Sequence, residues 1–378
     1  MRNVVLTLHL ASPTIMTKYS AFQKFKRNRL AVAGCIFTML LFFVMIGGCW
    51  IRPDSTRYAN NQQLVLATLT PGSEVQFVRL KKTDFRASGF LKDWINGGAP
   101  LEYEEIPVRS ITRNHDRIFV NGYNTTWQEK FPEGIATDAL MSKNGGVTEA
   151  DFIYSRRFWL GTDKYGRDVL SRLMAGTSVS LLVGIIAVII SVIMGLTVGL
   201  IAGYYRGWVD SLLMWVTNVV WAIPTLILVM AITFSMGSGL AVVFVAVGLT
   251  MWVDVARLVR GQVLSVREKE FIEAARAVGN SDFRIICRHI LPNIISPVIV
   301  LAASNFASAI LVEAGLSFLG LGAQIPQPSW GNMIREHYSF LTTDLAYLAF
   351  APGVLMMLLV LSFMLIGNGL RDALDVRS

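Results

Sequence analysis

A segment of small, charged and glycine residues lies between two long apolar stretches, and its residue types suit contact with another protein. Residues 265–293 read SVREKEFIEAARAVGNSDFRIICRHILPN. Phe271, Ala274, Ala275 and Val278 recur at helical spacing, and Gly279 follows them where a helix commonly ends. The pattern therefore predicts a helix, a tight turn and a second helix, with alanines small enough to let a partner surface approach closely.

Three interpretations of this segment compete. Composition alone favours a solvated amphipathic connector. A DNA-binding helix-turn-helix has a similar outline, but a segment fixed between two membrane crossings has no free end with which to dock on DNA. The third interpretation is a docking element for another protein subunit.

Catalytic, metal and cofactor chemistry lacks its usual motifs here. The sequence contains no G-x-x-x-x-G-K-[ST] phosphate-binding loop and no H-E-x-x-H zinc motif. The four histidines, His9, His115, His289 and His337, are scattered along the chain, and the three cysteines suggest no disulfide framework. We therefore expect no catalytic residue, no metal site and no cofactor.

The composition indicates a membrane protein. Of 378 residues, 53% are hydrophobic and 16% are charged, whereas soluble proteins carry about 25% charged residues. The mean hydropathy is +0.50. The net charge of +8 fits cytoplasmic loops rich in Lys and Arg better than a nucleic-acid surface, so nucleic acid is not expected as a partner.

The apolar stretches predict an all-α polytopic membrane protein with six transmembrane helices, since a spanning helix needs about 20 mostly apolar residues. The first stretch is too long for the apolar core of a signal peptide and has no small-residue cleavage site after it, so we expect it to be retained. Met16 is a plausible start of translation. The six predicted helices cover about residues 30–51, 179–202, 212–234, 240–255, 294–319 and 345–366.

Basic residues predict the orientation. Residues 1–29 and the segment 257–288 are rich in Lys and Arg, so we expect both of them, and both chain termini, to be cytoplasmic. Residues 52–157 then form an extracytoplasmic domain. Apolar runs on both sides of a Pro-Gly pair near residue 71, and again around Arg113–Asp116, predict β-hairpins within it.

Two groups of charged residues near the membrane have alternative roles. Glu313 is the acidic residue well inside an apolar span, where such groups usually face a cavity or a partner. It could line a translocation pathway, or it could equally pair with a neighbouring subunit. Asp163, Arg167 and Asp168 could form ion pairs and helix caps at the outer surface, which we favour about two to one over direct contact with substrate.

Four motifs resemble one transporter family. EAARAVG followed by ILP is similar to the EAA loop of the membrane subunits of ABC importers. Three further runs resemble signatures of the oligopeptide and dipeptide permease subunits, and together the four matches cover roughly residues 155–376. These runs are FWLGTDKYGRDVLSRLMAGTSVSL at 158–181, LVEAGLSFLGLGAQIPQPSWGNMI at 311–334 and GNGLRDALD at 367–375.

The resemblance implies a type I ABC importer permease fold over 158–376, in a bacterial inner membrane, that imports di- or oligopeptides. Residues 265–292 would form the EAA loop, which couples the permease to ATP hydrolysis. The implied coupling residues are Glu273, Ala274, Ala275, Gly279, Leu291 and Pro292. The implied residues of the outer signature are Gly161, Thr162, Asp163, Gly166, Arg167 and Asp168.

The implied partners are a second homologous permease, two ABC ATPase subunits, an extracytoplasmic solute-binding protein and membrane lipid. Two features depart from the family pattern, namely His289 at a position that is often aliphatic and the length of the segment 52–157. The same importer with nickel, glutathione or another small cargo remains an alternative. An ion-coupled transporter and a membrane-embedded enzyme are disfavoured by the EAA loop and by the missing catalytic set.

Overall fold

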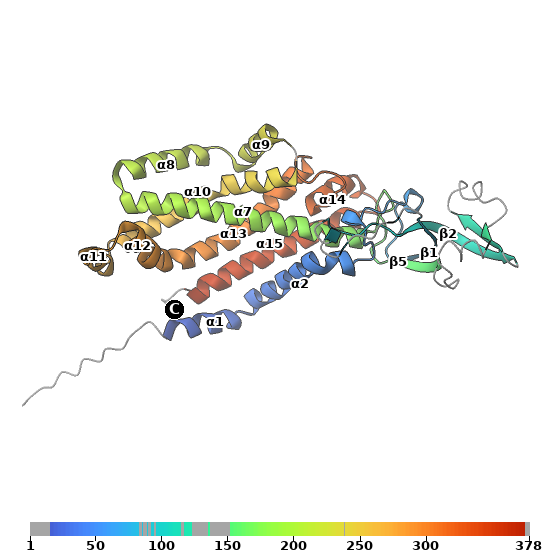
Figure 1. The fold of residues 1–378 in the computed structure, drawn as a ribbon, viewed down its shortest axis with the longest axis horizontal. Coiled ribbons are helices and arrows are strands. Elements are labelled where there is room, and N and C mark those ends of the chain that lie inside the picture. The colour runs from blue at the N-terminus through green and yellow to red at the C-terminus, as the bar shows by residue number, and fades with distance from the viewer. Residues whose placement is uncertain are drawn as a thin grey trace, which may run out of the picture.

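A helical bundle carries a small β-sheet at one end in the computed structural model, which describes residues 16–82, 85, 89, 92–93, 96–114, 117–122, 135–136, 152–237 and 239–374 (Figure 1). Five helical stretches there are long and apolar enough to cross a membrane, and a bent pair of helices can supply a sixth crossing. The five are α2 (Arg29–Ile51), α7 (Val169–Tyr205), α10 (Leu240–Arg267), α13 (Leu291–Phe318) with the short helices before it, and α15 (Tyr347–Leu374).

The bent pair consists of α8 (Gly207–Ala222) and α9 (Thr225–Met236), whose axes differ by 92°. The sequence predicted one helix over 212–234, whereas the structure divides this crossing into two helices at Pro224. Pro224 precedes the first residue of α9, and proline lacks the N–H that would continue the hydrogen-bond ladder of α8. The break therefore falls where the backbone cannot form the next helical bond.

Helices α7 and α10 pack against each other along a stripe of glycines on α7. A Cβ added at any of these glycines would lie under 3.0 Å from a valine side chain of α10, so only glycine permits this approach. The pairs are Gly195 with Val255, Gly199 with Val259 and Gly203 with Val263. Because the pairs run in the same order along both helices, the helices are parallel. The chain must cross back between them, and α8 with α9 makes that sixth crossing.

The spanning helices extend beyond the predicted apolar windows. Helix α7 begins at Val169, ten residues before the predicted start, because the Asp168 carboxylate accepts the Ser171 N–H at 2.8 Å and caps the helix. Helix α10 continues to Arg267 rather than ending near residue 255. Hydropathy marks the part of a helix inside the bilayer, whereas caps and ion pairs decide where the helix ends.

The sheet is five-stranded and antiparallel, with strand order β4-β3-β2-β1-β5. The predicted hairpin around residues 113–116 is confirmed, since β2 pairs with β3. The predicted hairpin at the Pro-Gly pair near residue 71 is wrong. Leu64–Leu66 forms a 3₁₀ turn, and β1 pairs with β2 and β5 instead. The strands are β1 (Ser73–Lys81), β2 (Tyr103–Asn114), β3 (Arg117–Gly122), β4 (Ile135–Ala136) and β5 (Ile153–Phe158).

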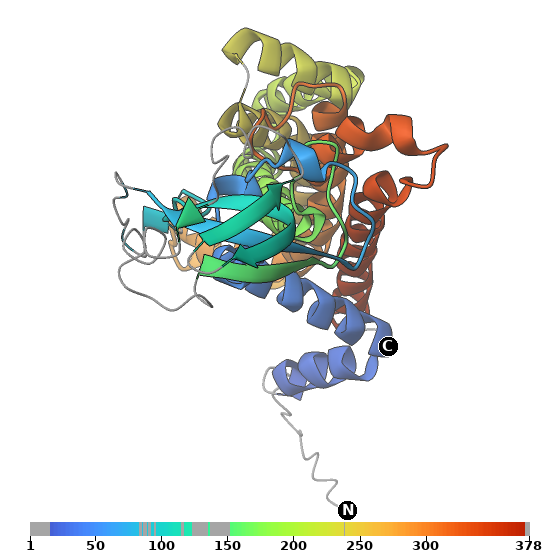
Figure 2. The same ribbon diagram turned by 90° about the vertical axis from the view of Figure 1, so that its right-hand side faces the viewer.

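The bundle has two distinct ends, which we name the sheet end and the α11 end. Helices α11 (Glu270–Ala277) and α12 (Asp282–Ile285) lie at the end opposite the sheet (Figure 1). Helix α1 (Met16–Arg27) packs beside α15 toward the α11 end. Helix α14 (Trp330–His337) lies near the sheet end, and Figure 2 shows the sheet in front of the bundle from that end.

Candidate functional site

The 270–285 segment forms the predicted helix, tight turn and helix. The turn depends on Gly279, whose φ of +83° lies in the left-handed region that favours glycine. The Gly279 N–H donates to the Arg276 carbonyl at 2.9 Å, and the Asn280 N–H donates to the Ala275 carbonyl at 3.2 Å. A Cβ at Gly279 would meet no atom within 4 Å, so the backbone conformation alone requires glycine here.

The apolar side chains of the 270–285 segment divide into two sets. Ile272, Ala275 and Ile285 are buried against α10 and the start of α13. The other set is exposed: Phe271 by 41%, Val278 by 83% and Phe283 by 77%. Of the predicted set Phe271, Ala274, Ala275 and Val278, Ala275 therefore packs on the bundle and the other three are exposed. Exposed apolar groups gathered on one turn are typical of a surface that another protein covers.

Most of the predicted coupling residues are accessible. Glu273, Ala274, Gly279 and Pro292 are exposed. Ala275 is buried, and Leu291 is half-buried against the same apolar cluster. Helix α11 thus exposes Glu273 and Ala274 and buries Ala275 against the bundle.

Polar contacts connect this segment to the end of α7. The Tyr204 hydroxyl donates to Asp282 Oδ1 at 2.6 Å, and the Arg276 guanidinium lies 5.3 Å from the centre of the Tyr204 ring. Arg267 donates to the Tyr204 carbonyl. These contacts join α12 to α7 through Tyr204, in addition to the chain connections to α10 and α13.

A buried ion cluster lies at the sheet end, and we define it as Asp163, Arg167, Arg172 and Glu336. Arg167 donates to Asp163 Oδ2 at 2.6 Å and to Glu336 Oε2 at 2.7 Å. Arg172 lies 3.9 Å from Asp163 and 3.8 Å from Glu336. All four side chains are at most 5% exposed. Two cations and two anions balance, so the cluster is electrically neutral as a unit.

The turn that holds the ion cluster is clamped to the chain that follows α2. Added Cβ atoms at Gly161 and Gly166 would lie 2.1 Å from the Leu69 carbonyl oxygen and 1.8 Å from that of Gln63. Thr162 is fully buried, and its hydroxyl accepts the Leu69 N–H at 2.8 Å. These contacts favour the interfacial role predicted for the outer signature over direct contact with substrate.

Asp163, Glu336 and His337 each offer a ligand atom within 4.8 Å of the others. Both carboxylates, however, already pair with Arg167, and a metal cation would lie beside two guanidinium groups. Burial lowers the pKa of His337, although its Nδ1 lies 2.8 Å from the Met333 carbonyl oxygen. Asp168, which caps α7, is not one of these three residues. Burial raises the pKa of Asp168, while the hydrogen bonds from Ser171 act to lower it. The chemistry of this cluster favours ion pairs rather than a metal.

Glu313 is fully buried and binds within its own chain. Ser317 Oγ donates to Glu313 Oε1 at 2.6 Å and accepts the Ala323 N–H at 3.1 Å. No described basic side chain forms an ion pair with Glu313. In this conformation Glu313 supports the loop between α13 and α14, and its predicted role in a pathway stays a prediction.

Sequence reasoning missed the residues that complete these sites. Glu336 pairs with Arg167 across 169 positions, and Tyr204 bonds Asp282 across 78. Nothing in the local pattern around Glu336 or Tyr204 marks such a contact. Ser317 stands four residues after Glu313, and this i, i+4 spacing was a signal that could have been used.

Two sequence families match this chain. Residues 195–377 match the family described as binding-protein-dependent transport system inner membrane component. Residues 19–70 match the N-terminal transmembrane domain of oligopeptide transport permease C. The two matches lie on opposite sides of the sheet insertion.

Curated relatives are similar over more than half of the chain. The glutathione transport system permease protein GsiD of Pectobacterium atrosepticum is 44% identical over 221 residues, which is 58% of this chain and 73% of that protein. The dipeptide transport system permease protein DppC of Alkalihalophilus pseudofirmus is 45% identical over 221 residues, which is 58% of this chain and 72% of that protein. The inward-facing MetNI methionine ABC transporter is similar in structure at a TM-score of 0.46 and 19% identity, over 55% of this chain and 97% of that chain.

Proposed function

Because this chain belongs to the family of binding-protein-dependent transport system inner membrane components, we propose that it imports short peptides. It is a multi-pass membrane permease of an ABC importer, a transport subunit whose ATP is hydrolysed on separate subunits. Dipeptide and glutathione permeases are both among its relatives. Glutathione is itself a short peptide, so a di- or oligopeptide cargo and a glutathione cargo belong to one chemical class.

The α11 end faces the cytoplasm in this proposal. Basic residues concentrate there, and positive charge favours the cytoplasmic side of a membrane. Helix α1 and the end of α15 lie toward the same end (Figure 1), so both chain termini are cytoplasmic and the sheet is extracytoplasmic. The basic residues described at this end include Lys24, Lys26, Arg27, Arg29, Arg206, Arg257, Arg260, Arg267, Lys269, Arg276, Arg284, Arg288 and Arg371.

The 270–285 segment docks on an ATPase subunit. The observation that carries this assignment is the exposed apolar set of Phe271, Val278 and Phe283 on both sides of the Gly279 turn at the α11 end, which a partner subunit can cover. Glu273, also exposed, can receive a basic or backbone donor from the partner. Leu291 and Pro292 begin α13 and carry the movement into the bundle.

The remaining assembly follows the family. A second homologous permease and two ATPase subunits complete the transporter, and an extracytoplasmic binding protein delivers cargo to the sheet end. Buried Ile272 and Ile285 make the 270–285 segment rigid with α10 and α13. Closure of the ATPase dimer then displaces these helices together and changes the side of the membrane from which cargo has access.

The test is uptake of labelled dipeptides by the assembled importer. Gly279→Asp strains a left-handed turn, and Glu273→Lys reverses an exposed charge, so both variants should abolish ATP-dependent uptake while membrane insertion is retained. Gly261→Asp is the matched control, because Gly261 is exposed in α10, has ordinary helical φ and has no atom within 4 Å of an added Cβ.

Normal uptake in both Gly279→Asp and Glu273→Lys would overturn the docking assignment. Uptake that does not depend on the partner ATPases would overturn the proposed importer itself. Uptake that fails for di- to pentapeptides but proceeds for glutathione would narrow the cargo to that peptide.

A further inference from the structure

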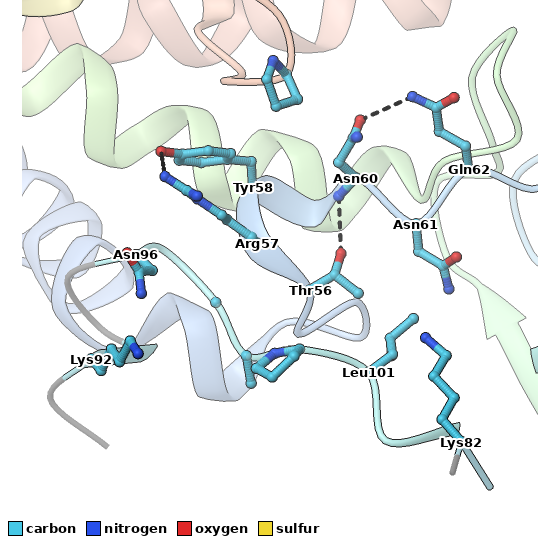
Figure 3. A pocket seen from close by; sticks show the side chains of 14 residues that line it. Thr56, Arg57, Tyr58, Asn60, Asn61, Gln62, Lys82, Lys92, Asn96 and Leu101 are labelled. Atoms are coloured by element: carbon cyan, nitrogen blue, oxygen red, sulfur yellow. Dashed lines mark hydrogen bonds between the residues drawn. The ribbon is translucent and has the colours of Figure 1, made fainter. Parts of the chain in front are cut away.

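A pocket of about 650 Å³ opens where the chain after α2 meets the loop before β2 (Figure 3). Pockets of 300–1,000 Å³ hold small organic molecules, so this one is larger than a bare ion needs. Pro326, from the loop between α13 and α14, completes the wall. Segments of the sheet domain and of the helical bundle therefore build the pocket together.

The charges on the pocket wall have one sign. Arg57, Lys82 and Lys92 line it, and its described lining residues include no Asp or Glu. Neither lysine forms an ion pair within the described part of the chain. Figure 3 shows the two lysines at opposite sides of the pocket, with Arg57 and Thr56 between them.

The nearest buried acids already have partners of their own. Asp54 accepts the N–H groups of Thr56 and Asn61 at 2.9 and 3.1 Å. Glu105 accepts from Arg156 at 2.8 Å and from the Tyr154 hydroxyl at 2.6 Å. These two carboxylates hold the loop in place, and neither Asp54 nor Glu105 is among the described residues that line the pocket.

The pocket is preorganised by its backbone. Tyr58 and Ala59 have φ of +61° and +49°, a conformation that non-glycine residues adopt only when their surroundings impose it. The Tyr58 N–H donates to the Gly97 carbonyl at 3.0 Å, and Arg52 donates to the same carbonyl at 2.6 Å. The Tyr58 hydroxyl accepts from Gln327 at 2.8 Å. The wall is thus fixed before any ligand arrives.

Amide side chains complete the lining. Asn60, Asn61, Gln62 and Asn96 offer both donors and acceptors, which match the N–H and C=O groups of a peptide bond. Cations separated across a pocket of this size can each receive one carboxylate. We propose that this pocket binds a short peptide carrying two carboxylates; the inference rests on the proposed function and specifies its cargo class.

The experiment is calorimetric titration of the full chain in phosphatidylcholine nanodiscs with Ala-Glu and Ala-Gln, which are nearly isosteric and differ by one negative charge. Ala-Glu should bind at least tenfold more tightly than Ala-Gln at low salt, and the ratio should fall as salt screens the exposed lysines. In Lys82→Gln/Lys92→Gln the ratio should drop below twofold.

Lys81→Gln is the matched control, because Lys81 is an exposed neighbour that pairs with Glu102 at 3.5 Å outside the pocket lining. Lys81→Gln should keep the full preference for Ala-Glu over Ala-Gln. Equal binding of the two dipeptides to the unaltered protein would overturn the proposal. Loss of Ala-Glu binding in phosphatidylglycerol nanodiscs would also overturn it, by assigning the pocket to a lipid headgroup.

An uptake assay distinguishes failure of the proposed pocket from failure of the proposed importer function. In the assembled importer, Lys82→Gln/Lys92→Gln should reduce uptake of Ala-Glu at least fivefold more than it reduces uptake of Ala-Gln. Unchanged Ala-Glu uptake would overturn the pocket assignment while the importer stands. Loss of uptake for every peptide in the unaltered protein would instead contradict the proposed function.

Discussion

The ion cluster and the 270–285 segment lie at opposite ends of the bundle and satisfy their side chains in opposite ways. Asp163, Arg167, Arg172 and Glu336 are buried and neutralise one another within the chain. The 270–285 segment leaves Val278 and Phe283 more than three-quarters exposed. One region satisfies its side chains within the chain, whereas the other exposes apolar side chains that the proposed ATPase subunit would cover.

This difference indicates which region fixes the structure and which transmits a signal. Removal of one member of a buried ion pair leaves an uncompensated charge in a low-dielectric site. Removal of an exposed apolar side chain costs the isolated chain little and costs a complex much. Substitutions in the ion cluster should therefore lower stability, whereas substitutions of exposed residues in the 270–285 segment should weaken partner binding.

Arg167→Gln should have the largest effect on stability. It leaves Asp163 and Glu336 buried with one fewer cation, which costs about 3–5 kcal/mol. Thermal unfolding of the purified chain in detergent measures it. The control is Glu268→Gln, which breaks the exposed pair of Glu268 with Arg206 at 2.5 Å and should leave the unfolding temperature unchanged. Equal effects of the two variants would remove the distinction between buried and exposed ion pairs.

Tyr204→Phe should have an intermediate effect. It removes the hydrogen bond to Asp282 and retains the ring beneath Arg276, at a cost of about 1 kcal/mol. We expect fewer peptides transported per ATP hydrolysed, with ATPase subunits still bound. Tyr205→Phe is the control, since Tyr205 is 52% exposed. An unchanged transport ratio in Tyr204→Phe would show that α7 does not receive the movement of α12.

Phe283→Ser should have the smallest effect on stability, within about 0.5 kcal/mol, because the side chain is 77% exposed. The same change should abolish co-purification of the ATPase subunits. Cys287→Ser, at an exposed position of the next helical turn, should retain them. Retention of the ATPase by Phe283→Ser would move the docking surface away from the 270–285 segment.

Hydropathy predicted the six crossings because bilayer burial depends on local composition. It did not predict the start of α7, where Asp168 and Arg172 continue the helix among polar partners. The missing N–H of Pro224 breaks the helix, but the 92° bend also depends on the packing of α9 against α10 and α13, which no local pattern records.

The 270–285 segment could be predicted as helix, turn and helix because Gly279 and the apolar spacing are local signals. The side that faces the bundle could not be, since Ile272 is buried by α10 and α13 rather than by its neighbours in sequence. Glu336 was invisible for a similar reason. Its partner Arg167 comes close only after α14 has folded back to the start of α7.

The glycine stripe of α7 has a mechanical consequence. Three valine side chains of α10 seat directly on the α7 backbone at Gly195, Gly199 and Gly203. Sliding one helix along the other would drive each valine into the next turn of α7, so the helices resist shear along this stretch, which covers about 12 Å of α10. A force applied at α11 would therefore tilt the two helices together rather than slide one past the other.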